Sequence, residues 1–340
     1  MPNMQVLLSI ELLVFGAVAL LTPFSVVAPV AAETGVGNFS PAAFHSFLRA
    51  PPSRLNSLPL ARARVQEPLS RDVRELGPVV AARGALVLDR ATGALLYEKD
   101  SERLFPIASL TKLMTALVFL DFRLDWNTRV AIRAGDLRGG GVEYFVPGET
   151  VTGRDLFFTA LVGSSNTAAA ALARSTGVSP EEFTKRMNDK AAALKMSSAY
   201  FADPTGLDER NVGSGRDVAL LSEAAFRSPA IVRAVTSKSY TFIPQNSKKK
   251  KRTIRSTDLL LVSALNSSPY RILGGKTGTL GEKTGYHLAL SVRSEETGRD
   301  FIIVVLGSET NASRFADAKT LAVWSFDAYE WPETRAVAAN

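Results

Sequence analysis

The order of strand-like and helix-like segments limits the folds open to this chain. Two apolar strand patterns, 84–88 and 95–97, come before a long region of helical patterns, and three more, 271–277, 286–292 and 301–306, follow it. Because strands must pair to satisfy their backbone groups, strands from both sides of the helical region are expected in one sheet. The sequence therefore predicts an α+β fold: an antiparallel sheet of about five strands, flanked by helices, with an adjoining helical lobe.

Capping residues and apolar periodicity place the helices. Ser179-Pro180-Glu181-Glu182 is a capping box with Pro at the first helical position. Helices are predicted to begin near Ser109, Arg154, Ser179, Ser214, Ser228 and Ser313, and a polar break at 163–166 interrupts the second. A further strand pattern at 240–243 precedes the basic run Lys248–Arg252, which we interpret as the solvated tip of a hairpin.

The scarce residue types exclude several kinds of chemistry. The 340-residue chain has no Cys and only two His, which excludes cysteine nucleophiles, thiolate zinc sites and disulfides. His45 lies in a segment without periodicity, and His287, in an apolar strand pattern, is interpreted as structural. We therefore predict no metal and no cofactor. The net charge of +7 is spread along the chain, so no nucleic-acid partner is predicted.

The N-terminus predicts export. Residues 12–20 read LLVFGAVAL, and apolar character continues to Val30-Ala31-Ala32, which offers the small residues of a signal-peptidase site. We interpret residues 1–32 as a signal peptide or, because about 21 apolar residues can cross a bilayer, as an uncleaved membrane anchor. Either places the rest of the chain in the periplasm or at the extracytoplasmic face of the cell membrane.

A proline-rich segment follows the N-terminal region. Residues 33–80 contain six prolines and little periodicity, which predicts a flexible tether with one short helix near 67–76. The folded domain is predicted over 81–331, and residues 332–340 are predicted to be a C-terminal tail.

The first candidate catalytic element is Ser109-Leu110-Thr111-Lys112. Residues three apart on a helix share a face, so the Ser109 hydroxyl and the Lys112 amine can touch. A lysine can activate a serine when burial or a neighbouring cation lowers its pKa from about 10.4 to about 7–8. A first-turn position also leaves the Ser109 N–H free to donate to an oxyanion. Alone, this spacing is equally typical of a helix cap with a solvated lysine.

The second element, Ser164-Ser165-Asn166, interrupts a helical pattern. Such a break is usually a turn. Here it would present a second hydroxyl, Ser164, that can pass a proton to a leaving group, and an amide, Asn166, that can hold the substrate backbone.

The third element, Lys276-Thr277-Gly278-Thr279, ends an apolar strand. Lys276 can fix an anionic substrate terminus and act as the cation that lowers the pKa of Lys112. Gly278 lets a substrate approach the backbone, and the Thr279 N–H can be a second oxyanion donor.

In order, these elements match S-x-x-K, S-x-N and K-T-G, the set of class A β-lactamases and penicillin-binding proteins. Residues 82–329 resemble the D-alanyl-D-alanine carboxypeptidase and endopeptidase family of low-molecular-mass penicillin-binding proteins. Ala108–Thr115 is similar to that family's nucleophile segment, and Phe201–Leu207 to its conserved loop. The resemblance implies a β-lactamase/transpeptidase-like fold and an acyl-enzyme on Ser109. It also implies peptidoglycan stem peptides, ending in or cross-linked through D-Ala, as substrates and β-lactam antibiotics as covalent inhibitors.

The resemblance also implies a role for each motif residue and a position within the family. It makes Ser109, Lys112 and Ser164 catalytic, and Asn166, Lys276, Thr277, Gly278 and Thr279 substrate-binding. Ser165, Thr167 and Thr279 depart from the family's usual residues, which leaves fine specificity open. Arg154–Leu156, Ser164–Asn166 and Phe315–Trp324 look closer to the endopeptidase branch than to the carboxypeptidases. A second Lys283-Thr284-Gly285 is interpreted as a turn, because no apolar strand precedes it.

Two other functions share this fold. A class A-like β-lactamase also needs a loop carboxylate to activate the deacylating water, and no Glu-x-x-Leu-Asn segment lies between Asn166 and Lys276. A non-catalytic scaffold that binds peptidoglycan has little physical reason to keep all of the serines, lysines and the asparagine of the three motifs.

Overall fold

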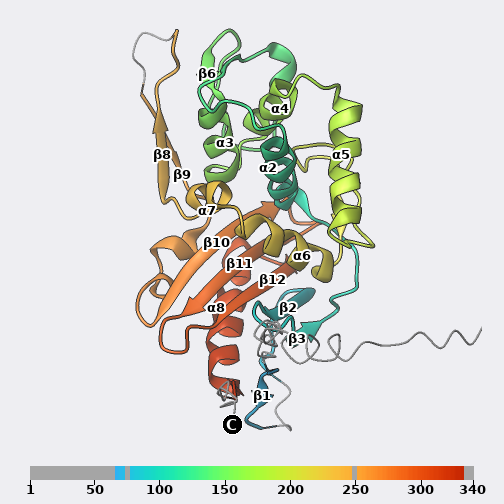
Figure 1. The fold of residues 1–340 in the computed structure, drawn as a ribbon, viewed down its shortest axis with the longest axis vertical. Helices are drawn as coiled ribbons and strands as arrows, with labels where there is room; N and C mark the ends of the chain where they lie inside the picture. The colour runs from blue at the N-terminus through green and yellow to red at the C-terminus, as the bar shows by residue number, and fades with distance from the viewer. Residues whose placement is uncertain (1–65, 73–76, 247–250, 333–340) are drawn as a thin grey trace, which may run out of the picture. The chain divides into compact units, whose positions relative to one another are not determined.

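The computed structural model describes residues 66–72, 77–246 and 251–332 (Figure 1). The predicted leader, most of the tether, Lys248–Lys250 of the basic run and the tail from 333 onward lie outside these ranges. Within them, no helix combines the length and the apolar character needed to cross a membrane.

A five-stranded antiparallel sheet forms the centre of the domain (Figure 1). Its strand order is β10 (Tyr270–Thr279), β11 (Tyr286–Ser294), β12 (Asp300–Ser308), β2 (Gly84–Asp89) and β3 (Leu95–Lys99). The pairing of β12 with β2 joins segments about two hundred residues apart, with Ile303 opposite Val87. The predicted fold class is confirmed.

The middle strand β12 is buried on both faces. Successive side chains of a strand point to opposite faces. Ile302 and Val304 therefore lie in the core shared with the helical lobe, whereas Ile303 and Val305 lie in the core shared with the helix on the other face. Two covered faces explain why Phe301–Leu306 is a continuous apolar run rather than an alternating one.

One helix, α8 (Asn311–Ala328), covers one face of the sheet, and α6 (Gly215–Phe226) and α7 (Pro229–Val235) lie on the other (Figure 1). The lobe beyond them consists of α2 (Thr111–Asp121), α3 (Gly153–Val162), α4 (Asn166–Ser175) and α5 (Pro180–Ala193). The active-site candidates lie where this lobe meets β10.

Side-chain caps explain where the helices begin. Ser179 accepts from the N–H of Glu182, with Pro180 as the first residue of α5, and Ser214 forms a capping box with Asp217 at the start of α6. Each cap satisfies N–H groups that the first helical turn leaves free. These predicted starts are confirmed; α8 begins two residues before its predicted start, because Thr310 is its cap.

Small two-stranded ladders complete the fold. They pair β4 (Phe105–Pro106) with β7 (Val212–Gly213), β5 (Arg129–Ala131) with β6 (Thr150–Thr152), and β8 (Ser239–Phe242) with β9 (Arg252–Arg255). The last pair is the predicted hairpin. The solvated tip predicted over Lys248–Arg252 is wrong at Arg252, which begins β9 and forms an ion pair with Glu149, its side chain only 20% exposed.

The helix predicted near 67–76 is wrong at Leu69–Ser70. These two residues form β1, which pairs with β13 (Tyr329–Glu330) after α8. A two-residue strand that pairs with a segment more than 250 residues away leaves no periodicity in the local sequence. The apolar pattern near Leu69 therefore could not indicate this pairing. Residues 73–76 lie outside the described part.

Candidate active site

Ser109 lies in a turn of 3₁₀ helix, η1 (Ala108–Leu110), that leads directly into α2. Ala108 has a left-handed backbone with φ of +50°, which costs a non-glycine residue on the order of 1–3 kcal/mol. Gly206 packs so closely that a Cβ there would lie 2.0 Å from the Ala108 carbonyl oxygen. The loop that contains Gly206 can therefore pack against the strained turn of Ser109 only because residue 206 has no side chain.

Three acceptors surround the buried amine of Lys112. Its Nζ donates to Ser109 Oγ at 2.8 Å, to Asn166 Oδ1 at 2.7 Å and to the Thr205 carbonyl at 2.5 Å. The Asn166 amide is oriented by its own bond from Nδ2 to the Gly139 carbonyl, 2.7 Å. Because carbonyl oxygens only accept, a neutral Lys112 directs its two N–H groups to them and its lone pair to the Ser109 hydroxyl.

The charge state of Lys112 suits a base. The side chain is 1% exposed. Burial lowers the pKa of Lys112 to about 7, against an opposite effect of the Asp203 carboxylate. A base with a pKa near the working pH is present in its neutral form and still binds the transferred proton.

A second serine–lysine pair joins the lobe to the sheet. Lys276 of β10 is 1% exposed, and its Nζ donates to Ser164 Oγ at 2.8 Å and to the Thr277 carbonyl at 2.8 Å. Ser164 has φ of +58° and lies between α3 and α4, where Ser165 caps α4 by accepting from the Ala168 N–H. The predicted break at 163–166 is confirmed as the turn between two helices.

The electrostatic relation between the two lysines differs from our prediction. We expected Lys276 to lower the pKa of Lys112, but burial lowers that pKa. Burial also lowers the pKa of Lys276 well below its usual value, and the charges of Lys112 and Arg314 lower it further, while Asp258 raises it. The repulsion between two such cations is mutual, and Lys276 has Arg314 as a further cation acting on it and Asp258 as an opposing anion.

The end of β10 lies against the Ser109 turn. A Cβ on Gly278 would lie 2.9 Å from the Ile107 carbonyl oxygen and 3.3 Å from the Leu110 nitrogen, so glycine allows the strand to approach. Thr279 follows as an exposed residue. The Thr277 hydroxyl shares a 2.6 Å hydrogen bond with the Thr257 hydroxyl, which holds β10 to the segment that contains Thr257.

Sequence reasoning missed residues that act through their backbone. The Thr205 carbonyl orients Lys112, and the Gly139 carbonyl orients Asn166. A pattern of side chains in the sequence cannot indicate where a backbone carbonyl will point. The Asp203 carboxylate accepts from the N–H groups of Gly206 and Asp208, at 2.8 and 2.7 Å, and so shapes this loop. The glycine run at 139–141 is a local signal that the chain passes close to other groups, whereas the loop Phe201–Leu207, which contains Thr205, was predicted only from its resemblance to the family.

Two minor predictions are confirmed. Lys283–Gly285 lies in the turn between β10 and β11, where the Gly285 N–H donates to the Gly281 carbonyl. His287 is fully buried, its Nδ1 accepts from the Gly307 N–H at 3.0 Å, and burial lowers its pKa to about 3. It is a neutral structural residue.

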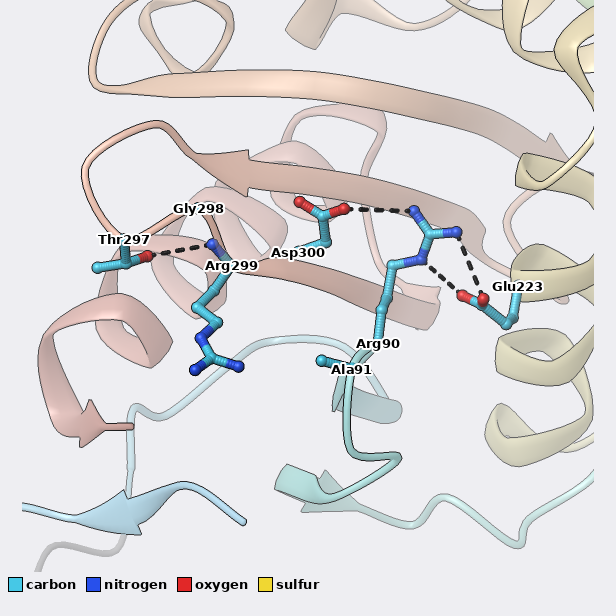
Figure 2. A pocket seen from close by; sticks show the side chains of 7 residues that line it. All are labelled: Arg90, Ala91, Glu223, Thr297, Gly298, Arg299 and Asp300. Atoms are coloured by element: carbon cyan, nitrogen blue, oxygen red, sulfur yellow. Dashed lines mark hydrogen bonds and ion pairs between the residues drawn. The ribbon is translucent and has the colours of Figure 1, made fainter. Parts of the chain in front are cut away.

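Another recess lies between the β11–β12 turn, the β2–β3 turn and α6 (Figure 2). Arg90 pairs there with Glu223 at 2.6 Å and with Asp300 at 3.8 Å, and the Arg299 guanidinium lies 5.4 Å from the Trp331 ring centre. The carboxylates of this recess are paired with arginine, so they offer no free base, and the motif residues line no part of it.

Comparison with known proteins decides the family. The model of the D-alanyl-D-alanine carboxypeptidase family matches residues 71–310. The chain belongs to this family. A D-alanyl-D-alanine endopeptidase of Pseudomonas aeruginosa is 33% identical over 273 residues, 79% of this chain and 84% of the relative. A D-alanyl-D-alanine carboxypeptidase of Bacillus subtilis is 29% identical over 261 residues, 73% of this chain and 63% of the relative.

Solved structures agree with this membership. The Streptomyces K15 DD-transpeptidase superposes with a TM-score of 0.67 at 26% identity, covering 74% of this chain and 99% of that one. Penicillin-binding protein D2 of Listeria monocytogenes, in its ampicillin-bound form, gives 0.62 at 28% identity with the same coverage. The chain is thus a serine-type peptidase of the D-Ala-D-Ala family with a penicillin-binding fold.

Proposed function

We propose that Ser109 is the nucleophile of this peptidase and that Lys112 is its general base. The geometry around Lys112 supports the assignment. Its Nζ lies 2.8 Å from Ser109 Oγ, and the carbonyls of Asn166 and Thr205 occupy its other two directions. The lone pair of the neutral amine then faces the proton that must be removed.

The reaction proceeds through an ester. Lys112 takes the Ser109 proton as Oγ attacks the carbonyl carbon of a D-Ala peptide bond. The N–H groups of Ser109 and Thr279 donate to the oxyanion; loss of one such donor typically costs about 10²–10³ in rate. As the C–N bond breaks, Lys112 returns the proton to the leaving amine through the Ser164 hydroxyl. Water then attacks the ester carbonyl, and the Ser109 hydroxyl is restored as the acyl peptide leaves.

The remaining motif residues hold the substrate. Protonated Lys276, on the edge strand β10, pairs with the carboxylate next to the scissile bond, and Asn166 binds a backbone amide on the acyl side. Gly278 and Thr279 let the substrate lie along β10. Penicillins offer the same carbonyl and carboxylate, so they acylate Ser109 and are released slowly.

We propose further that the substrate is a cross-linked stem peptide cleaved outside the cytoplasmic membrane. Endopeptidases of Pseudomonas aeruginosa and Haemophilus influenzae are 33% and 31% identical to this chain, and Arg154–Leu156 and Ser164–Asn166 resemble that branch. Peptidoglycan lies outside that membrane, so the predicted leader at 1–32 fits this substrate.

The decisive test combines a covalent probe with two substrates. The purified protein and its Ser109→Ala variant are incubated with a fluorescent penicillin and examined by intact mass. One adduct per wild-type chain, absent from the variant, is expected. Cross-linked dimers and uncross-linked pentapeptides are then compared as substrates, with faster cleavage of the dimer expected.

Each contrary outcome supports a different function. A well-folded protein without adduct would indicate a peptidoglycan-binding scaffold. Rapid catalytic hydrolysis of the penicillin would indicate a β-lactamase. Faster release of the terminal D-Ala from the pentapeptide would indicate a carboxypeptidase.

A further inference from the structure

The segment 138–145, called the glycine loop below, is bound to the start of α4 by hydrogen bonds that the reaction as described so far does not use. Asn166, the first residue of α4, donates to the Gly139 carbonyl of this loop at 2.7 Å. The next residue, Thr167, is 1% exposed and departs from the family's usual residue at this position. A buried hydroxyl is expected to have hydrogen-bond partners, and those of Thr167 lie in the glycine loop.

The Thr167 hydroxyl joins the two ends of the glycine loop. Its Oγ1 donates to Glu143 Oε2 at 2.7 Å and accepts from the Arg138 N–H at 3.1 Å. The other Glu143 oxygen, Oε1, accepts from the N–H groups of Tyr144 and Phe145 at 3.0 and 3.2 Å, which fixes the direction of the carboxylate. One hydroxyl therefore holds Arg138, which precedes the three glycines, and Glu143, which follows them.

The glycine loop packs against the turn that contains Asn166. Gly140 has φ of +84°, and a Cβ there would lie 3.4 Å from Asn166 Nδ2 and 2.9 Å from the Leu207 side chain. At the other end of the turn, a Cβ on Gly163 would lie 3.1 Å from the Tyr144 ring. Consecutive glycines restrict the backbone little, so the position of the loop depends on the contacts at its ends.

The orientation of the Asn166 amide depends on the glycine loop. Its Oδ1 accepts from the Lys112 amine, and its Nδ2 donates to the Gly139 carbonyl. Because a carbonyl oxygen only accepts, the Gly139 carbonyl selects the orientation in which Nδ2 faces the loop and Oδ1 faces Lys112. Gly139 follows directly after Arg138, whose N–H is bound to Thr167, so a displacement of the loop moves this carbonyl.

We propose that Thr167 is a positioning residue, whose hydroxyl fixes the glycine loop and thereby orients the Asn166 amide that binds the acyl side of the substrate. The inference rests on the proposed role of Asn166. Without the hydroxyl the loop is released at both ends, and ligands that carry an amide on the acyl side react more slowly. Lys112 keeps the Ser109 hydroxyl and the Thr205 carbonyl as partners, so ligands without that amide lose little.

The test compares three probes on the full chain. Benzylpenicillin and its methyl ester, which lacks the carboxylate, both carry a side-chain amide, whereas aminopenicillanic acid, the penicillin nucleus with a free amine, does not. The second-order rate constant for acylation of Ser109 is measured for the wild type and for Thr167→Val, which keeps the branched side chain and removes its hydroxyl.

The expected result is a selective loss. Benzylpenicillin and the ester should react with Thr167→Val about tenfold more slowly than with the wild type, part of the roughly 10²-fold that a displacement of about 1 Å costs. Aminopenicillanic acid should react at nearly the wild-type rate. Equal losses with the free acid and the ester would place the effect on the amide and not on the carboxylate.

Three further variants identify the hydroxyl as the cause. Thr167→Ser restores a hydroxyl and should recover the wild-type ratio between the probes. Glu143→Ala removes the partner at an exposed position and should reproduce the Thr167→Val ratio, and the double variant should lose no more than Glu143→Ala alone. Thr159→Val is the matched control, because the buried Thr159 hydroxyl of α3 has no hydrogen-bond partner among the described residues. It should leave the ratio unchanged.

Contrary results are distinguishable from a failure of the proposed function. An equal loss with all three probes, or a selective loss that Thr167→Ser does not recover, overturns the positioning role. Unchanged rates in both Thr167→Val and Glu143→Ala overturn it as well. If Thr167→Val does not fold, Glu143→Ala carries the same comparison between probes. In each of these cases the Ser109 adduct still forms in the wild type, whereas its absence there would overturn the proposed function.

Discussion

The two serine–lysine pairs are alike in geometry and opposite in surroundings. In each, a lysine that is 1% exposed donates to a serine hydroxyl at 2.8 Å. Lys112 lies among carbonyl oxygens near the Asp203 carboxylate, whereas Lys276 is surrounded by the charges of Lys112, Arg314 and Asp258.

This difference separates two chemical tasks. A base must be neutral with its lone pair directed at one proton, and fixed carbonyl acceptors achieve that without adding charge. A carboxylate-binding group must become positive when substrate arrives, and a nearby anion helps it to do so. Under the proposed roles, the same residue type supplies a base, Lys112 on α2, and a cation, Lys276 on β10.

The largest effect is expected for Lys112→Met. Without a base, acylation of Ser109 by penicillin should slow by about 10²–10⁴-fold, and the ester and the free acid should be affected equally. Stopped-flow acylation measures this, with a thermal melt to establish folding. Acylation at the wild-type rate would remove Lys112 from the mechanism.

A smaller loss is expected for Gly206→Ala, which perturbs only the turn beside Lys112. The new Cβ would lie 2.0 Å from the Ala108 carbonyl, so the turn must shift, and a displacement near 1 Å can reduce the rate about 10²-fold. Gly93→Ala is the matched control, since Gly93 also has positive φ but nothing within 4 Å of its Cβ. Equal acylation by the two variants would contradict a steric role for Gly206.

Lys276→Met should slow acylation only by ligands that carry a carboxylate. A hydrogen bond to a charged group contributes about 1.5–3 kcal/mol, so acylation by benzylpenicillin should fall about 10–100-fold while acylation by its methyl ester changes little. Comparing the two rate constants in one preparation checks this. A matching loss with the ester would show that Lys276 assists the chemical step itself.

The smallest effect concerns the pH response of Lys112. Its pKa is lowered to about 7 by burial, and only the neutral amine accepts a proton. Acylation by the uncharged ester should therefore rise about tenfold per pH unit below 7 and level off above it. A rate that is flat between pH 5 and 7 would contradict Lys112 as the base.

Much of this could be predicted from the sequence. The continuous apolar run in β12 and the caps at Ser179 and Ser214 are local patterns with a direct physical cause, and the three motifs contain side chains that the structure brings into contact. The features that could not be predicted are contacts between segments that lie far apart in the sequence. The Thr205 carbonyl, the pairing of Leu69 with Glu330 and the crowding of cations around Lys276 arise only when remote segments meet.

The pairing of β2 with β12 sets the order in which this site can be built. Ser109 and Ser164 belong to the first two thirds of the chain, whereas Lys276 lies on the edge strand β10, whose neighbour in the sheet, β11, follows it in the sequence. Such long-range pairing slows folding, because the loop must close before the contacts form. The chain therefore gains the second serine–lysine pair, and the packing of Gly278 against the Ser109 turn, only when β10 joins the rest of the domain. Acylation by penicillin would then report completion of folding as well as chemistry.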